Sequence, residues 1–367
     1  MKNFTKKKYK LNKKKFYTSK TDIQFISFFS GCGGLDIGAI LNGFSIISSL
    51  DNDRDSIETL KSNKVFLNTE HNLNDVRVIK DKDYANIIKR NNPNKLYVIG
   101  GPPCQPFSKA GYWQTDKKRK GHKDPKNMID PYLDFIKGIQ PDGFILENVE
   151  SILHPKNLPY FNHIKERIIS MGFNLEIHKL NAADFGVPQK RKRVFFIAKK
   201  SKILSNLIAT HGNEKSVLSN AGLKNHERVI DWIGEYDDPK YSDNYDSIEG
   251  KYRDDLIQVP AGKNYMHLTA KYHYPNPKFI AGKRYWTFLL KLNPLLPSNT
   301  IISSPGHWEG PFHWNNRRLR IKELAAIQSF PCDYRFYGSR RSVIKQIGNA
   351  VPPLLAKAVI QSLVNEK

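Results

Sequence analysis

One stretch near the N-terminus constrains the fold of this chain more than any other. Residues 25–29 form an apolar, strand-like run, residues 30–34 a glycine-rich turn, and residues 35–41 a helix-like pattern. A strand, a glycine turn and a helix in this order are typical of doubly wound sheets that bind nucleotide-type cofactors at their carboxyl edge. A glycine turn that lacks the dinucleotide fingerprint can also be only a tight connection between strand and helix. We therefore predict an α/β, doubly wound, Rossmann-like fold.

Two acids follow the next predicted elements. Apolar residues 44–50 end in Asp51, at about the distance from the glycine turn at which an acid grips ribose hydroxyls. Asp75 ends the following segment. Either could instead be a helix N-cap, and for a single Asp after a strand this interpretation is at least as well supported.

A cysteine marks the end of another apolar run, residues 96–99. The sequence Gly100-Gly101-Pro102-Pro103-Cys104 follows, with a further proline at 106. The prolines fix the backbone around the thiol, and the glycines let another molecule approach the main chain. This placement favours an outward-facing nucleophile, Cys104. The alternative is an incidental cysteine in a proline-rich loop.

Two more strand-like runs carry polar groups. Glu147 ends the apolar run 144–146, where burial would raise its carboxyl pKa and let it donate a proton near neutral pH. The alternative is a solvated glutamate. Before the predicted strand 194–198, alternation places Gln189, Arg191 and Arg193 on one face.

The order of these motifs resembles that of the DNA (cytosine-5)-methyltransferase family. The resemblance spans roughly residues 24–198 and 295–365 and rests on six motifs in order. They are the turn at 29–33, Pro103-Cys104-Gln105, Glu147-Asn148-Val149, Gln189-x-Arg191-x-Arg193, RRLRIKELAAIQSFP at 317–331 and QIGNAVPP at 346–353. Six ordered matches make coincidence a negligible explanation.

The resemblance implies methyl transfer from S-adenosylmethionine to carbon 5 of a flipped-out cytosine in a specific sequence of double-stranded DNA. The Cys104 thiolate would add to carbon 6, because carbon 5 alone is too electron-poor to react. Protonated Glu147 would donate its proton to ring nitrogen 3. Arg193 would hold the ring oxygen, and Arg191 and Gln189 would brace Arg193. Base flipping is expected because such a site cannot reach a stacked base.

The resemblance also implies a set of cofactor-binding residues. Asp51 would accept hydrogen bonds from the ribose hydroxyls, and Asp75 with Val76 would hold the adenine ring. Asn349 would close the pocket near the methionine end of the cofactor. The full implied set is Phe29, Gly31, Gly33, Asp51, Asp75, Val76, Ile129 and Asn349. The chain departs from the family pattern at Leu96, Lys126 and Arg320, none of them a reacting group.

The charge of the chain fits a polyanionic partner. Its formal net charge is +24 over 367 residues, which predicts attraction to DNA that weakens steeply with salt. Residues 108–126, including Lys117, Lys118 and Lys120, suggest a cationic loop that closes over DNA, although a solvated surface loop has the same composition. Residues 1–20 hold nine lysines and no acid, which predicts a disordered basic arm.

Cysteine spacing and hydropathy indicate the cellular setting. Cys32, Cys104 and Cys332 form no CxxC pair or zinc spacing, which argues against a structural metal and fits a reducing cytoplasm. We find no signal peptide and no run that predicts a membrane span. We expect a soluble, monomeric, DNA-associated protein of the bacterial cytoplasm.

The length predicts more than one domain. We assign residues 21–198 to the catalytic domain, 199–316 to a smaller irregular target-recognition domain, and 317–367 to a segment that returns to the catalytic domain, with a helix at 352–364 beside the cofactor turn. In 199–316 the strand–helix pattern stops, and aromatic residues alternate with basic ones. We expect most of these aromatics in a core, and Arg and Lys on loops to read bases.

Other functions remain open at this stage. A module that binds cofactor and DNA without reacting would not need Cys104 and Glu147. A tRNA cytosine methyltransferase would share every catalytic residue, but a recognition region of this size favours duplex DNA. An adenine amino-methyltransferase is disfavoured, because no Asp/Asn-Pro-Pro-aromatic tetrapeptide follows a strand. The stand-alone size resembles bacterial modification enzymes, for which a cognate endonuclease acting on the same site is expected without direct contact.

Overall fold

The computed structural model describes residues 8–11, 22–103, 127–201 and 207–365. Its centre is a seven-stranded sheet, which consists of β1 Ile23–Phe28, β2 Ser45–Asp51, β3 Glu70–Leu73, β4 Lys95–Gly100, β5 Gly143–Val149, β6 Asn174–Asn181 and β7 Lys192–Lys199. The order of the strands in the sheet is β3-β2-β1-β4-β5-β7-β6. Strands β1 to β5 pair in parallel, whereas β7 is antiparallel to both β5 and β6. The order reverses between β1 and β4, the position at which such sheets bind ligands. The predicted α/β, Rossmann-like fold is confirmed.

Apolar runs of the sequence form β1, β2, β4, β5 and β7, whereas β3 and β6 are largely polar. The helices around the sheet are α2 Gly34–Leu41, α3 Arg54–Lys61, α4 Asp81–Asn91, α5 Ile129–Ile139, α6 Leu158–Ser170, α10 Ile321–Ile327, α11 Arg340–Asn349 and α12 Pro353–Val364.

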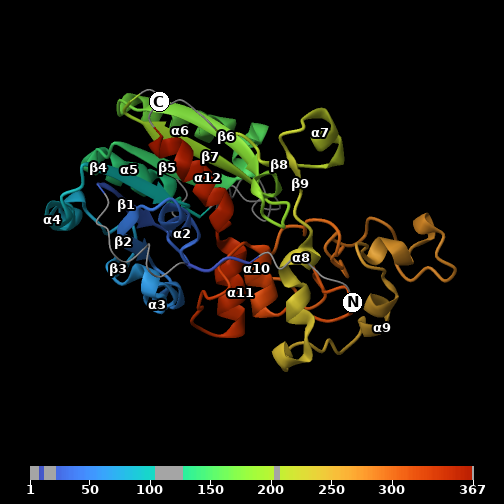
Figure 1. Ribbon diagram of the computed structural model, residues 1–367. Helices are drawn as coiled ribbons and strands as arrows, with labels where there is room; N and C mark the ends of the chain where they lie inside the picture. The colour runs from blue at the N-terminus through green and yellow to red at the C-terminus, as the bar shows by residue number, and fades with distance from the viewer. Residues whose placement is uncertain (1–7, 12–21, 104–126, 202–206, 366–367) are drawn as a thin grey trace.

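Strand alternation divides the buried residues between the two faces of the sheet. Phe25 belongs to an apolar cluster shared with α2, α3 and α12, whereas its neighbour Ile26 belongs to a cluster shared with α4, α5 and α6. Both faces are therefore covered by helices, as a sheet with apolar side chains on both faces requires. As expected from the sequence, α12 packs beside α2 (Figure 1).

The stretch Arg340–Val364 is long and apolar enough to cross a membrane, but 67 % of its most apolar window is buried inside the protein. It also consists of two helices, α11 and α12, with a break at residues 350–352. These features are those of core helices in a folded domain.

The region between β7 and α10 contains short elements, as the loss of patterning predicts. They are β8 His211–Gly212, α7 Glu214–Ser219, β9 Lys224–Asn225, α8 Val229–Ile233 and α9 Arg253–Gln258. A separate apolar cluster, which includes Leu256, Tyr265 and Phe288, lies within residues 248–312. In contrast, Val229 and Trp232 of α8 belong to the apolar cluster shared with α2, α3 and α12. The α8 helix lies against α10 (Figure 1).

The expectation of a disordered arm needs correction at residues 8–11. Leu11 is buried, and Cys332 N donates a hydrogen bond to Tyr9 O at 3.1 Å. The prediction of disorder relied on the number of lysines. It overlooked Tyr9 and Leu11, whose apolar surface is removed from water when these residues pack. The rest of the predicted arm lies outside the described residues.

Candidate active site

A cavity of about 390 Å³ opens at the carboxyl ends of β1, β2, β4 and β5. Its wall includes Phe29 and Gly31 after β1, Asp51 at the end of β2, and Glu147 in β5. This edge collects the residues that end the parallel strands, although they lie far apart in sequence. The volume lies in the range of small-molecule and cofactor pockets.

The glycine turn shapes one side of the cavity. Gly31 has φ +52°, and a Cβ built there would meet no heavy atom within 4 Å, so the backbone borders open space. Gly33 also has a positive φ, but a Cβ there would lie 2.8 Å from Leu60 Cδ2. Gly33 therefore faces the core and does not line the cavity, in contrast to Phe29 and Gly31.

Asp51 joins the turn to the second strand. Its Oδ2 accepts a hydrogen bond from Gly31 N and its Oδ1 one from Asp53 N, both at 2.8 Å. The N-cap of α3 is Asp53, whose carboxylate accepts from Asp55 N at 3.2 Å. Burial raises the pKa of Asp51, and the two backbone hydrogen bonds oppose that shift. Each carboxylate oxygen can still accept a second hydrogen bond from a ligand.

Glu147 and Arg193 form an ion pair in the wall of the same cavity. Strand register places Arg193 opposite Val149, diagonally across from Glu147 and on the same face. Arg193 Nε lies 2.9 Å from Glu147 Oε1, and only 11 % of the Glu147 side chain is exposed. This burial excludes the solvated glutamate. It raises the pKa of Glu147, against the opposing charges of Arg193 and Arg191.

Arg191 and Gln189 are buried behind the cavity. Arg191 Nη2 donates to Gly348 O at 2.7 Å and Nη1 to Ile301 O at 3.5 Å. Gln189 Oε1 accepts from Ile301 N at 3.0 Å. Of the three residues expected on one face, only Arg193 lines the cavity. The other two precede β7 and connect this part of the chain to Ile301 and to the C-terminal segment, where Gln189 Nε2 also donates to Ile327 O at 3.4 Å.

The α11 helix closes the opposite side of the cavity. Asn349 lines it, as expected, together with Lys345 and Gln346. Lys345 Nζ also lies 2.9 Å from Asp53 Oδ2, which ties α11 to the start of α3. Sequence reasoning missed Lys345, although its spacing of four residues from Asn349 places both on one helix face.

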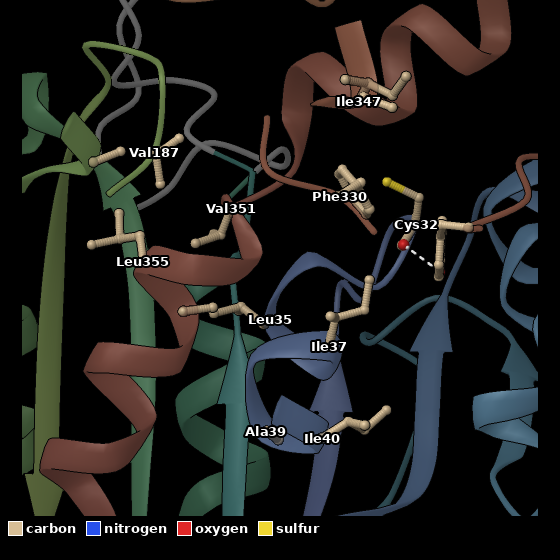
Figure 2. Packing of buried hydrophobic residues seen from close by; sticks show 14 of the residues in the cluster. Cys32, Leu35, Ile37, Ala39, Ile40, Val187, Phe330, Ile347, Val351 and Leu355 are labelled. Atoms are coloured by element: carbon tan, nitrogen blue, oxygen red, sulfur yellow. Dashed lines mark hydrogen bonds between the residues drawn. The ribbon is translucent and has the colours of Figure 1, made fainter. Parts of the chain in front are cut away.

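Figure 2 shows the apolar interior beneath the glycine turn, where Leu35 of α2 lies near Val351 and Leu355 of the C-terminal segment. The approach of the two segments is close, because a Cβ on Gly34 would lie 2.2 Å from Val351 O. Leu35, Gly34 and Val351 also line the cavity. The glycine turn and the segment that carries Asn349 are therefore held against one another.

Besides Gly33, three of the expected cofactor residues lie outside this lining. Asp75 forms an ion pair with Arg77, with Oδ2 2.5 Å from Nη2. Val76 and Ile129 are buried in the apolar cluster against which Phe29 packs. They can support the wall but do not border the cavity. Cys104, Lys117, Lys118 and Lys120 lie outside the described residues, although Pro103, bonded to Cys104, lines the cavity.

Comparisons with known proteins identify the family of the chain. The family model for C-5 cytosine-specific DNA methylases matches residues 23–365. The chain is 33 % identical over 383 residues to the type II methyltransferase M.SacI of Streptomyces achromogenes, covering 94 % of this chain and 93 % of that protein. It is 28 % identical to M1.HphI of Haemophilus parahaemolyticus, over 95 % of this chain and 90 % of that protein.

Solved structures share the fold. A prophage-encoded DNA modification methyltransferase of E. coli matches with a TM-score of 0.64 at 24 % identity, over 93 % of this chain and 98 % of that one. The DNMT2 protein of Spodoptera frugiperda matches with a TM-score of 0.57 at 16 % identity, over 93 % and 99 % of the two chains.

Proposed function

Because the chain belongs to the C-5 cytosine-specific DNA methylase family and is a DNA (cytosine-5)-methyltransferase, we propose that it methylates one cytosine within a specific duplex sequence through a covalent Cys104 adduct. The observation that carries this proposal is the buried Glu147–Arg193 pair in the cavity that Asp51 and Pro103 also line. A proton donor, a cation and the backbone leading to a thiol thus meet at a cofactor-sized cavity.

The cavity fits S-adenosylmethionine as the methyl donor. Its open space beside Gly31, its buried acid Asp51 and the polar side chain of Asn349 match a ligand with a ribose and an amino-acid end. When bound, the cofactor supplies a methyl group on a positively charged sulfur. We propose that Asp51 accepts from the ribose hydroxyls and that Asp75 with Val76 holds the adenine ring, which requires Asp75 to exchange its contact with Arg77.

The proposed chemistry begins at Cys104. Its thiolate forms a bond to carbon 6 of cytosine, and the electron pair moves into the ring toward nitrogen 3. Protonated Glu147 supplies the proton there, because burial disfavours its charged form. Arg193, held by Glu147, can donate to the ring oxygen. Once carbon 5 carries the methyl group, loss of the carbon 5 proton to water expels Cys104 as the thiolate. The proton on nitrogen 3 returns to the Glu147 carboxylate, which restores the neutral ring and the acid.

The surroundings of the site suggest how DNA is selected. We propose that residues 199–316 read the sequence, that residues 108–126 contact phosphates, and that the target base leaves the stack to reach Glu147. The similarity to type II methyltransferases supports a role as the modification partner of a restriction endonuclease that acts on the same site. We propose a monomer that acts on cytoplasmic DNA.

Three measurements test the covalent mechanism. Bisulfite sequencing of DNA from cells that express the protein should show one modified cytosine in a fixed context. Cys104→Ser should abolish this modification, while calorimetry with S-adenosylmethionine should give an affinity close to that of the unchanged protein. The unchanged enzyme should form a stable adduct with duplex DNA that has 5-fluorocytosine at the target, because fluorine does not leave as a proton does. Appreciable turnover by Cys104→Ser would remove the covalent mechanism.

A further inference from the structure

Residues 8–11 lie at the joint between the recognition region and the C-terminal part of the catalytic domain. Tyr9 Oη donates a hydrogen bond to Ser329 O at 2.6 Å, and Cys332 N donates to Tyr9 O at 3.1 Å. Leu11 N donates to Asp333 Oδ1 at 3.4 Å. Tyr9 is thus bound to the segment that follows α10, and Figure 1 shows the blue N-terminal segment passing beside α10.

This anchor connects directly to the cofactor turn. Tyr334, in the same segment, donates its hydroxyl to Cys32 O at 2.8 Å. Cys32 lies between Gly31, which lines the cavity, and Gly33, the N-cap of α2. Tyr9 is therefore attached to a part of the protein whose position is fixed relative to the catalytic cavity.

The residue before Tyr9 contacts the other side of the joint. Lys8 Nζ lies 3.9 Å from the centroid of the Tyr236 ring and forms an ion pair with Glu235. Both partners belong to the 3-10 helix Gly234–Asp237, which follows α8 and leads toward the separate core of the recognition region. Tyr236 itself packs, like α8, in the apolar cluster shared with α2, α3 and α12. Arg320 binds the same connection, because its Nη1 donates to Asp238 O at 3.0 Å and its Nε to Asp246 Oδ2 at 3.0 Å.

We infer that Lys8 and Tyr9 form a strap that sets the position of the recognition region relative to the cavity, with Tyr9 as a positioning residue for DNA binding. Adjacent Cα atoms are about 3.8 Å apart, so a movement that separates Tyr236 from Ser329 must break one of the two anchors. The inference rests on the proposed role of residues 199–316 in DNA recognition. Lys8 then has partners within the protein, Glu235 and Tyr236, whereas its charge alone would indicate a contact with DNA phosphate.

Three single variants of the full-length protein test the strap. Tyr9→Ala removes both the ring and the hydroxyl, Tyr9→Phe removes only the hydrogen bond to Ser329, and Lys10→Ala removes an exposed charge from the same segment. Initial rates should be measured on an unmethylated duplex that contains the recognition sequence and on a duplex in which one base pair of that sequence is changed. All rates should be taken below the start of thermal unfolding of every variant.

We expect Tyr9→Ala to raise KM for the cognate duplex by about tenfold with kcat nearly unchanged, because it weakens binding equally in ground and transition states. Discrimination against the altered duplex should fall, and the affinity for S-adenosylmethionine should not change. Tyr9→Phe should give a smaller effect in the same direction. Lys10→Ala should behave as the unchanged protein.

Distinct results would overturn the inference. A lower melting temperature of Tyr9→Ala with unchanged KM and discrimination would show that the segment only stabilises the fold. Equal losses in Tyr9→Ala and Lys10→Ala, with a reduced salt dependence of binding, would identify the segment as a phosphate contact. If Tyr9→Ala does not fold, Lys8→Ala gives the same test from the other anchor. Failure of the proposed function is separate, because the unchanged protein would then methylate neither duplex.

Discussion

Buried carboxylates are the main chemical feature of the carboxyl edge of the sheet. Burial raises the pKa values of Glu147, Asp51 and Asp36 alike, yet the three groups have different neighbours. Glu147 contacts an arginine, Asp51 contacts backbone amides, and Asp36 contacts serine hydroxyls. Only the first two line the cavity, so burial by itself does not identify a functional acid.

Asp51 can be tested by removing its carboxylate. We expect Asp51→Ala to weaken binding of S-adenosylmethionine by about 1.5 to 3 kcal/mol, the range for a lost hydrogen bond to a charged group. Calorimetry on the free protein measures this directly. Asp55→Ala is a matched control, because Asp55 lies in the first turn of α3 and does not line the cavity. An unchanged affinity in Asp51→Ala would limit Asp51 to holding the amides of Gly31 and Asp53.

Asp36 should make stability depend on pH. Its carboxylate accepts from Ser27 Oγ and Ser49 Oγ, both at 2.9 Å, but burial outweighs these bonds and raises its pKa from 3.8 to about 6. Because the folded protein holds this proton more tightly than the unfolded chain, the contribution is complete below pH 4 and is lost as pH rises through 6. The loss amounts to about 3 kcal/mol at 1.36 kcal/mol for each pKa unit.

The matched variant is Asp36→Asn, which cannot ionise. Urea unfolding at several pH values should show the stability of the unchanged protein falling relative to this variant between pH 4 and 7. Parallel curves for the two proteins across this range would mean that Asp36 does not hold a proton in the folded state.

At the scale of elements, the contact between α2 and α12 positions the cofactor turn. A Cβ on Gly38 would lie 2.5 Å from Ala356 Cβ and 2.8 Å from the Ala356 carbonyl carbon. The helices approach so closely that their backbones are nearly in contact. We expect Gly38→Ala to lower the free energy of unfolding by about 1 to 3 kcal/mol, the usual cost of overpacking, even though alanine favours helix formation.

The double variant Gly38→Ala with Ala356→Gly tests the origin of this effect. Removing the Ala356 methyl relieves the shortest contact, so chemical unfolding should show that the two substitutions cost less together than the sum of their separate effects. Strict additivity would place the strain elsewhere. Cofactor affinity should fall with the single variant, because α2 begins at the turn that lines the cavity.

At the scale of the whole molecule, the elements were more predictable than their contacts. Apolar runs located β1, β2, β4, β5 and β7 but not the largely polar β3 and β6, and the residues at the strand ends met because parallel strands share one carboxyl edge. Alternation did not separate Arg193 from Arg191, because Arg191 donates to the backbone carbonyl of Gly348, 157 residues away. Similarly, a count of lysines could not show that Tyr9 packs on a distant segment.

The division between chemistry and recognition can be tested by exchanging residues. Replacing 199–316 by the corresponding region of a related enzyme should move methylation to the donor's sequence, because the cavity residues outside it are unchanged. A narrower exchange of 248–312 keeps α8 and its contacts with α10 and should do the same with less damage to the joint. Removing the charges of Lys117, Lys118 and Lys120 should instead weaken binding on all sequences and reduce its salt dependence, since phosphate contacts carry no sequence information. Bisulfite sequencing distinguishes the outcomes. A folded, cofactor-binding chimera that still methylated the original sequence would place recognition in the catalytic domain.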